Sequence, residues 1–234
     1  MADSSSGDGA DERSRDELNQ LLHDAAEAGD VVKLRQAIAA GADVNAVLHF
    51  AIKGHTLKIT PLCSAVREDK VKENRAEEGR TACVRALLAA GASVSAAGVF
   101  YQDEVDPAYM ALHSCAYVGL NTCCRLLLDA GADMNAPDNN DSTTPLQYAA
   151  EDNRHRTVVL LLSRGAATDD ECTAALEEYS PGYLTRIERA GSFGKYQKQQ
   201  RAKLMAMLAP KFSHLLPPEL VSHVITFWGH LGWK

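Results

Sequence analysis

One short phrase returns along the chain, each time directly after a run of apolar residues. It reads Gly-Ala-Asp-Val-Asn at 41–45, Gly-Ala-Ser-Val-Ser at 91–95 and Gly-Ala-Asp-Met-Asn at 131–135, and it shortens to Gly-Ala at 165–166. A glycine that ends an apolar run again and again predicts a stacked array of helical repeats. Arrays of this kind usually present one extended surface to other macromolecules.

The upstream halves of the units also agree with one another. Two units open with Thr-Pro-Leu, at 60–62 and 144–146, and the unit between them has Met-Ala-Leu-His at 110–113. This pattern resembles the ankyrin repeat, which has a period of about 33 residues and a Thr-Pro-Leu-His-x-Ala start. The resemblance covers roughly residues 18–168. It implies an all-α solenoid of stacked helix pairs with β-hairpin fingers.

The recurrent residues have structural reasons. Proline in the first turn of a helix sacrifices no hydrogen bond, so Thr-Pro marks a helix start. The glycine of Gly-Ala supplies the left-handed residue that ends the second helix. The resemblance implies that His23 and His113 bond to neighbouring backbone. We also expect a turn residue between the two helices of each unit, at Gly29, Gly79, Gly119 and Asn153.

Three regions follow from the pattern. Residues 1–16 are rich in Ser, Gly and Asp without periodicity, and we expect a disordered acidic tail. Residues 17–168 form the repeat array of about four units. Residues 169–234 hold a degenerate repeat and a helical cap. Within that region we expect a helix pair over 170–190 and a basic amphipathic helix over 193–208.

The intervals between the glycines are irregular. The stretches 47–59 and 97–109 are each seven residues longer than an ideal repeat allows, and they predict two neighbouring, extended β-hairpin fingers. A further ten residues, 69–78, separate the two helices of the second unit. This charged stretch either prolongs a helix or forms a solvated loop.

Composition limits the setting. No apolar run approaches the length needed to span a bilayer, and the acidic start does not resemble a signal peptide. Of the six cysteines, Cys63, Cys115 and Cys124 occupy small or apolar core positions of the repeat. Buried reduced thiols are typical of a cytoplasmic or nuclear protein, which is the location we expect.

The formal net charge of −7 is unevenly distributed. Residues 1–17 carry −4 and residues 18–182 carry −9, whereas residues 183–234 carry +6. An acidic array repels nucleic acid, so the charge favours a protein partner with a neutral or basic surface. The basic C-terminal helix is compatible with a solvated face, with pairing to the acidic array, or with an anionic partner.

The extended fingers are the first candidate binding site. Exposed aromatic side chains make good interface anchors. The alternative is that Phe50 and Phe100 pack on each other and hold the fingers together. The aromatic residues of the fingers are Phe50, Phe100, Tyr101 and Tyr109.

The first helices supply the second part of the candidate site. Tyr117 and Val118 are apolar at outward positions where polar residues would suit solvent, and Tyr148 extends the patch. Glu151 and Asp152 give it an acidic rim that suits a Lys or Arg of the partner.

The C-terminal segment has two interpretations. It resembles the start of an F-box, and a SOCS box also ends near a Leu-Pro motif; either would recruit a ubiquitin ligase. An apolar helix that caps the last repeat is the alternative, because arrays require terminal caps. The residues that carry the resemblance are Leu216, Pro217, Glu219, Leu220 and Ile225.

Catalysis finds no support in the sequence. The chain has no phosphate-binding glycine loop, no nucleophile motif and no regular metal-ligand spacing, so we expect no cofactor. Asn45 and Asn135 occupy the position that asparaginyl hydroxylases modify in ankyrin repeats. We therefore expect a non-catalytic protein-binding module. The alternatives are a substrate adaptor of a cullin-type ubiquitin ligase and a dedicated chaperone or assembly factor.

Overall fold

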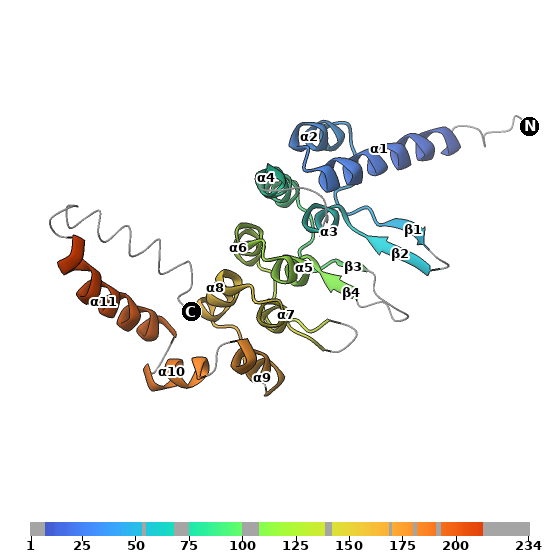
Figure 1. Ribbon diagram of the computed structural model, residues 1–234. Helices are drawn as coiled ribbons and strands as arrows, with labels where there is room; N and C mark the ends of the chain where they lie inside the picture. Colours follow the sequence, from blue (N-terminus) through green and yellow to red (C-terminus); the bar gives the residue numbers. More distant parts are fainter. Residues whose placement is uncertain are drawn as a thin grey trace, which may run out of the picture. The chain divides into compact units, whose positions relative to one another are not determined.

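A computed structural model describes residues 8–52, 55–67, 75–99, 108–138, 142–168, 170–179, 182–190 and 193–212 (Figure 1). The chain divides into two compact units, Met1–Pro145 and Leu146–Lys234. Each is considered by itself.

The first unit is built from three helix pairs and two short hairpins. The inner helices α1, α3 and α5 contact one another in sequence, and so do the outer helices α2, α4 and α6. This arrangement confirms the expected all-α repeat solenoid. In chain order its elements are α1 (Asp8–Ala28), α2 (Val31–Ala39), β1 (Leu48–Ile52), β2 (His55–Ile59), α3 (Pro61–Val66), α4 (Arg75–Ala89), β3 (Ala97–Val99), β4 (Ala108–Met110), α5 (Ala111–Val118) and α6 (Asn121–Asp129).

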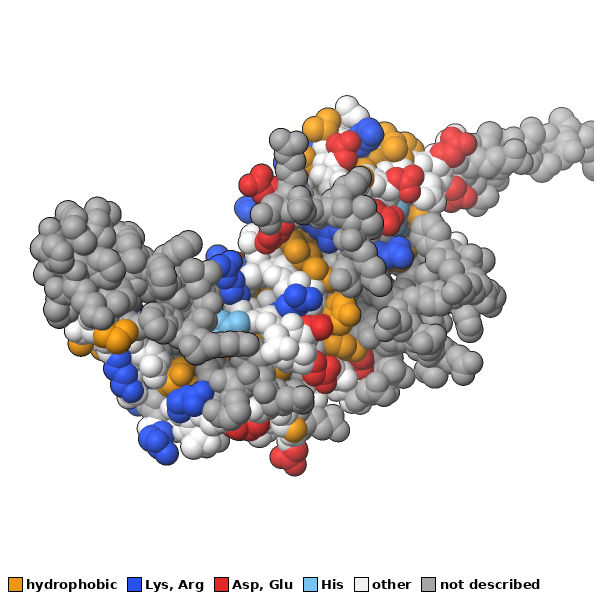
Figure 2. All heavy atoms as spheres, viewed as in Figure 1, with side chains coloured by type: hydrophobic (Ala, Val, Ile, Leu, Met, Phe, Trp, Pro, Cys, Tyr) orange, Lys and Arg blue, Asp and Glu red, His pale blue; other side chains and the backbone are white. Residues whose placement is uncertain are grey.

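The second unit is wholly helical in its described part. A helix pair comes first, then the pair predicted at 170–190, and finally the basic helix predicted at 193–208, which runs on to Phe212. Lys and Arg side chains are prominent on this last part of the chain (Figure 2). The elements are α7 (Pro145–Glu151), α8 (His155–Arg164), α9 (Asp170–Tyr179), α10 (Tyr183–Ala190) and α11 (Phe193–Phe212).

The Gly-Ala phrase ends each second helix in the same way. Gly41, Gly91, Gly131 and Gly165 have φ of 96°, 87°, 89° and 93°, the left-handed region that glycine enters without strain. The alanine that follows then donates its N–H back to a carbonyl five residues earlier, at 3.0 Å from Ala42 to Ala37. The same bond recurs from Ala92 to Leu87, Ala132 to Leu127 and Ala166 to Leu161.

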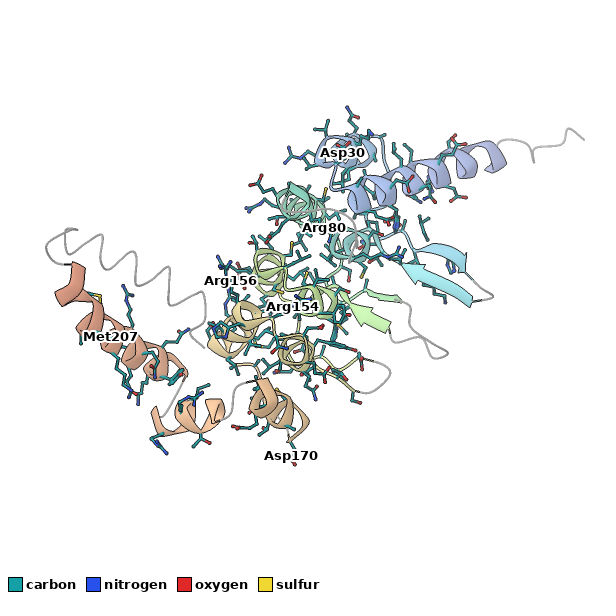
Figure 3. The ribbon with its side chains drawn as sticks, viewed as in Figure 1. Asp30, Arg80, Arg154, Arg156, Asp170 and Met207 are labelled. Atoms are coloured by element: carbon teal, nitrogen blue, oxygen red, sulfur yellow. The ribbon has the colours of Figure 1, made fainter. Side chains whose placement is uncertain are left out.

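Helix starts use more than one device. Asp30 begins α2, where its carboxylate accepts the N–H groups of Val32 and Lys33 at 3.1 Å (Figure 3). Thr60 begins α3, where its hydroxyl accepts the Cys63 N–H at 3.3 Å and Pro61 follows directly. Met110 has no such oxygen, and the His113 ring accepts the Met110 N–H at 3.2 Å instead.

Both repeat histidines tie their helix to the next loop. His113 accepts at Nδ1, so its proton is on Nε2, which donates to the Ala136 carbonyl at 2.8 Å. In the first repeat, His23 contacts the Ala46 carbonyl through Nε2 and the Ser64 hydroxyl through Nδ1, both at 3.0 Å. The expected bonds from histidine to backbone are confirmed, and His23 also reaches the second repeat.

Gly79 does not have the role predicted for it. Gly29, Gly119 and Asn153 have positive φ of 68°, 85° and 55° at their turns, but Gly79 lies inside α4. The end of the charged stretch 69–78 is helical, because α4 begins at Arg75. Gly79 allows close backbone approach, because a Cβ there would lie 2.6 Å from the Gly29 carbonyl oxygen.

Two hairpins confirm the predicted fingers. β1 and β2 are antiparallel with Ile52 opposite His55, and β3 and β4 pair Ala97 with Met110. Strand β2 also contacts β3, so the bases of the two fingers are neighbours. The stretches 53–54 and 100–107 lie outside the described residues.

The first helix differs from the prediction at its start. α1 begins at Asp8, within the region 1–16 for which no regular structure was expected. Acidic residues at 8, 11 and 12 suit the first turns of a helix, because the N-terminal end of the helix dipole is positive. Composition alone therefore underestimated this helix.

We predict that Gly79→Ala destabilises the chain. Inside a helix alanine normally stabilises the fold by about 1 kcal/mol relative to glycine. Here, however, its methyl group must displace the backbone of Gly29. Overpacking of this kind costs about 1–3 kcal/mol, so the urea midpoint followed by circular dichroism should fall. Gly194→Ala is the control, since nothing lies within 4 Å of that position in α11. A Gly79→Ala variant as stable as the parent would contradict the contact.

We also predict that stability declines as pH falls below about 6.5. Burial lowers the pKa of both His23 and His113, so the unfolded chain takes up protons before the folded chain does. Each histidine then lowers the free energy of unfolding by up to about 1.4 kcal/mol for each pH unit below its unfolded-state pKa. The free energy of unfolding of a His23→Gln/His113→Gln variant should vary less between pH 7 and 5, about the titration range of histidine. Exposed His49→Gln is the control, and equal pH slopes for all three proteins would refute the assignment.

Candidate protein-binding surface

The inner helices of the first unit present a row of side chains at their C-terminal ends. Glu27 lies in the last turn of α1 and Arg67 directly follows α3, and their charged groups are 3.7 Å apart. Both side chains are about half exposed, so this ion pair contributes at most about 1 kcal/mol.

Tyr117 continues this row on α5. The residue is 42% exposed although the six residues before it in the helix are all buried. Val118 beside it is half-buried. An exposed tyrosine on a rigid, otherwise buried helix is suited to anchor a partner, because its ring adds much contact area while only its own rotamer must be fixed.

The finger aromatics are placed only in part. In the β1–β2 register Phe50 lies opposite Leu57. Tyr109 lies opposite Gly98. The structure does not describe the side chains of Phe50 and Tyr109, and Phe100 and Tyr101 lie outside the described residues. Their role in binding stays a prediction.

The second unit holds the other predicted residues. Tyr148 and Asp152 are half-buried on and just after α7, and Glu151 is exposed at its end. Burial, followed by the charge of Asp152, raises the pKa of Glu151. A cationic group nearby would relieve both effects. Tyr117 and Val118 belong to the first unit, so the predicted patch is divided between the two units.

The two asparagines lie in the exposed loops after Gly-Ala. Asn45 joins the first two repeats, since its side-chain oxygen accepts the Ser93 N–H at 2.8 Å and its amide donates to the Gly91 carbonyl at 3.4 Å. Asn135 is exposed, and its N–H donates to Asp133 at 2.9 Å. Hydroxylation at either site stays a prediction.

All six cysteines are buried, and none of them forms a disulfide. Burial raises the pKa of the Cys83 thiol to about 11. Burial also raises the pKa of Cys115, whereas hydrogen bonding with Cys115 lowers that of Cys123. The core positions predicted for Cys63, Cys115 and Cys124 are confirmed, since all three side chains are fully buried.

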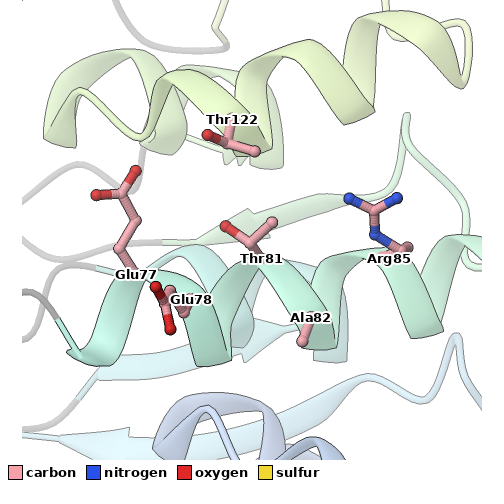
Figure 4. Close-up of a pocket in the computed structure, with 6 residues that line it drawn as sticks. All are labelled: Glu77, Glu78, Thr81, Ala82, Arg85 and Thr122. Atoms are coloured by element: carbon pink, nitrogen blue, oxygen red, sulfur yellow. The ribbon is translucent and has the colours of Figure 1, made fainter.

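Sequence reasoning missed an open groove beside α4. Its lining comes from the outer helices α4 and α6 (Figure 4). The sequence signal for this groove was the inserted stretch 69–78, because it supplies the two glutamates at one end of the groove. The lining residues are Glu77, Glu78, Thr81, Ala82, Arg85 and Thr122.

Within the described residues, no group of three or more His, Cys, Asp or Glu side chains is arranged to hold a metal ion. In the same part of the chain, no helix has both the length and the apolarity required to cross a membrane.

Comparison with known families agrees with the geometry. A family model of ankyrin repeats, in three copies, matches residues 73–172. Over residues 73–172 the chain is similar to ankyrin repeats. The matched region runs from just before α4 into α9, and the first helix pair upstream repeats the same Gly-Ala ending. Comparison with curated proteins finds no significant match.

The C-terminal resemblance to an F-box or SOCS box is not supported. The ankyrin-repeat match ends before this segment. Leu216, Pro217, Glu219, Leu220 and Ile225 lie outside the described residues. One Leu-Pro pair and one Glu-Leu pair are too short a pattern to distinguish a ligase-binding box from an ordinary helix start.

We predict that the cysteines resist modification in the folded chain. Their sulfurs are shielded by the packed helices, and a thiol must open to solvent and ionise before it reacts. Ellman's reagent at neutral pH should therefore label fewer than one thiol in the time that labels all six in concentrated guanidinium chloride. Rapid labelling of one site in the folded protein, located by mass spectrometry, would contradict this packing.

Proposed function

We propose that this chain is a non-catalytic module that binds a partner protein through its fingers and the outward row on its inner helices. Ankyrin repeats are generally protein–protein interaction modules and are typically non-catalytic. The proposal extends that general role to one particular side of the first unit.

The row at the ends of the inner helices is the observation that carries the proposal. Glu27 and Tyr117 lie in the last turns of α1 and α5, and Arg67 directly follows α3, which contacts both of these helices. A charged pair and an exposed aromatic ring on successive repeats offer both a polar contact and an anchor. The helices are ordered before binding, so a docking partner loses little additional entropy in the array.

Charge indicates the class of partner. Residues 18–182 carry −9, and Glu151 with Asp152 adds an acidic pair in the second unit. A neutral or basic protein surface therefore suits the array better than nucleic acid does. No described residue favours a cullin-ligase adaptor, and none distinguishes a chaperone or assembly factor from another binding protein. The cytoplasmic or nuclear location also stays a prediction.

We expect Tyr117→Ala to weaken partner binding about tenfold or more, which corresponds to about 1.4 kcal/mol for loss of an aromatic anchor. The measurement is quantitative affinity purification from a native extract, followed by titration of the recovered partner against the purified chain. A Phe100→Ala/Tyr101→Ala variant tests the finger in the same assay.

The matched control is Val32→Ala. Val32 is 63% exposed on α2, an outer helix, so the change removes exposed apolar surface away from the proposed site. The parent and the control should bind equally. Equal binding by the Tyr117 and finger variants as well would show that this side of the unit is not the binding surface.

A further inference from the structure

The outer helices of the first unit carry a groove that the proposed binding side does not use. It has a volume of about 600 Å³ and is open to solvent. Helix α4 supplies five of its lining residues, and Thr122 at the start of α6 forms the opposite wall (Figure 4). The outward row described above comes from α1, α3 and α5 instead.

The two faces of α4 carry different kinds of residues. The groove side follows the helical spacing 77, 78, 81, 82 and 85, and the opposite side follows 79, 80, 83, 84 and 87. On the opposite side, Cys83, Val84 and Leu87 are fully buried, and Gly79 lies against the Gly29 backbone. The helix is thereby fixed on one side, and its groove side is held in one orientation.

Charge of opposite sign marks the two ends of the groove. Glu77 and Glu78 are exposed in the first turn of α4, and Arg85 is exposed farther along the same side. None of the three forms an ion pair with another described residue. At a rise of 1.5 Å per residue, Glu77 and Arg85 are separated by about 12 Å along the helix.

The middle of the groove is small and polar. Thr81, Ala82 and Thr122 have short side chains, so they allow the backbone or short side chains of another helix to approach closely. The Thr81 hydroxyl forms a hydrogen bond with the Cys123 sulfur of α6, at a distance of 3.6 Å. The short side chains let a partner come close to the groove, and the opposite charges at its two ends favour one orientation of that partner.

We propose that this groove is a second docking surface, and that it takes an α-helix of a partner protein. That helix has a Lys or Arg at the Glu77–Glu78 end and an Asp or Glu at the Arg85 end, seven or eight positions apart. This occupant matches the charge at both ends, and a helix is straight over the length of the groove. A nucleic acid would match Arg85 but be repelled by the two glutamates.

The charges also set the orientation of the bound helix. A helix is stabilised by acids near its N-terminus and bases near its C-terminus. A partner helix with that distribution matches the groove only when it runs antiparallel to α4. The opposed helix dipoles then add to the attraction between the side chains.

The test is a selection of displayed helical peptides on the full chain. The library keeps an alanine-rich helical frame and randomises the exposed positions. We expect the enriched peptides to carry a basic and an acidic residue seven or eight positions apart, with the acid nearer the N-terminus. A Glu77→Lys/Glu78→Lys/Arg85→Glu variant should bind them at least about fivefold more weakly and should enrich peptides of reversed order.

Two further variants make every outcome decisive. Thr122→Trp fills the groove without a change of charge and should also abolish binding, whereas Tyr117→Ala should bind the peptides as the parent does. Circular dichroism checks that each variant is folded. If the triple charge variant does not fold, the binding measured for Thr122→Trp tests the proposal in its place. Enriched peptides that bind Thr122→Trp as they bind the parent, that lack the charge pair, or that do not appear at all would overturn the proposal. Loss of binding in Tyr117→Ala alone would assign the peptides to the inner-helix row instead.

Discussion

Burial of leucine between successive helices is the interaction on which the rest of this structure depends. Each pair of the first unit contributes two fully buried leucines, and α7, α8 and α9 contribute one each to the second. The buried set is Leu22, Leu34, Leu62, Leu87, Leu112, Leu127, Leu146, Leu161 and Leu176. Helix α3 shows how strong this dependence is. Its six residues are all buried, and a helix of that length does not persist in water without neighbours.

The regular parts of the repeat could be predicted because each rests on a local rule. Gly41 must be left-handed for Ala42 to reach back to Ala37, so the Gly-Ala phrase carries its geometry within a few residues. The same holds for Thr60 and Pro61 at a helix start. The first finger was predictable as a hairpin because its sequence has two strand-like runs on either side of Lys53-Gly54, and these runs pair as β1 and β2.

The rest could not be predicted because it depends on distant contacts. Gly79 occupies the place of a turn glycine in the repeat pattern, and only the proximity of Gly29 shows that it permits close packing instead. The groove combines residues of α4 with Thr122, far along the chain. The outward Tyr117 was predictable from its position in the repeat, whereas the pairing of Glu27 with Arg67 needed the spacing between two helices.

The charged stretch before α4 links these departures from the ideal repeat. In a regular unit the glycine would end the first helix, and the second helix would begin after it. Here the extra residues let the second helix begin at Arg75, so Gly79 falls inside α4 and packs on the preceding unit. The same stretch supplies Glu77 and Glu78, which lie in the first turn of α4 and line one end of the groove. One insertion thus tightens the core on one side of α4 and creates a charged edge on the other. The insertion makes this repeat differ from its neighbours, and it thereby gives α4 a charged outer surface.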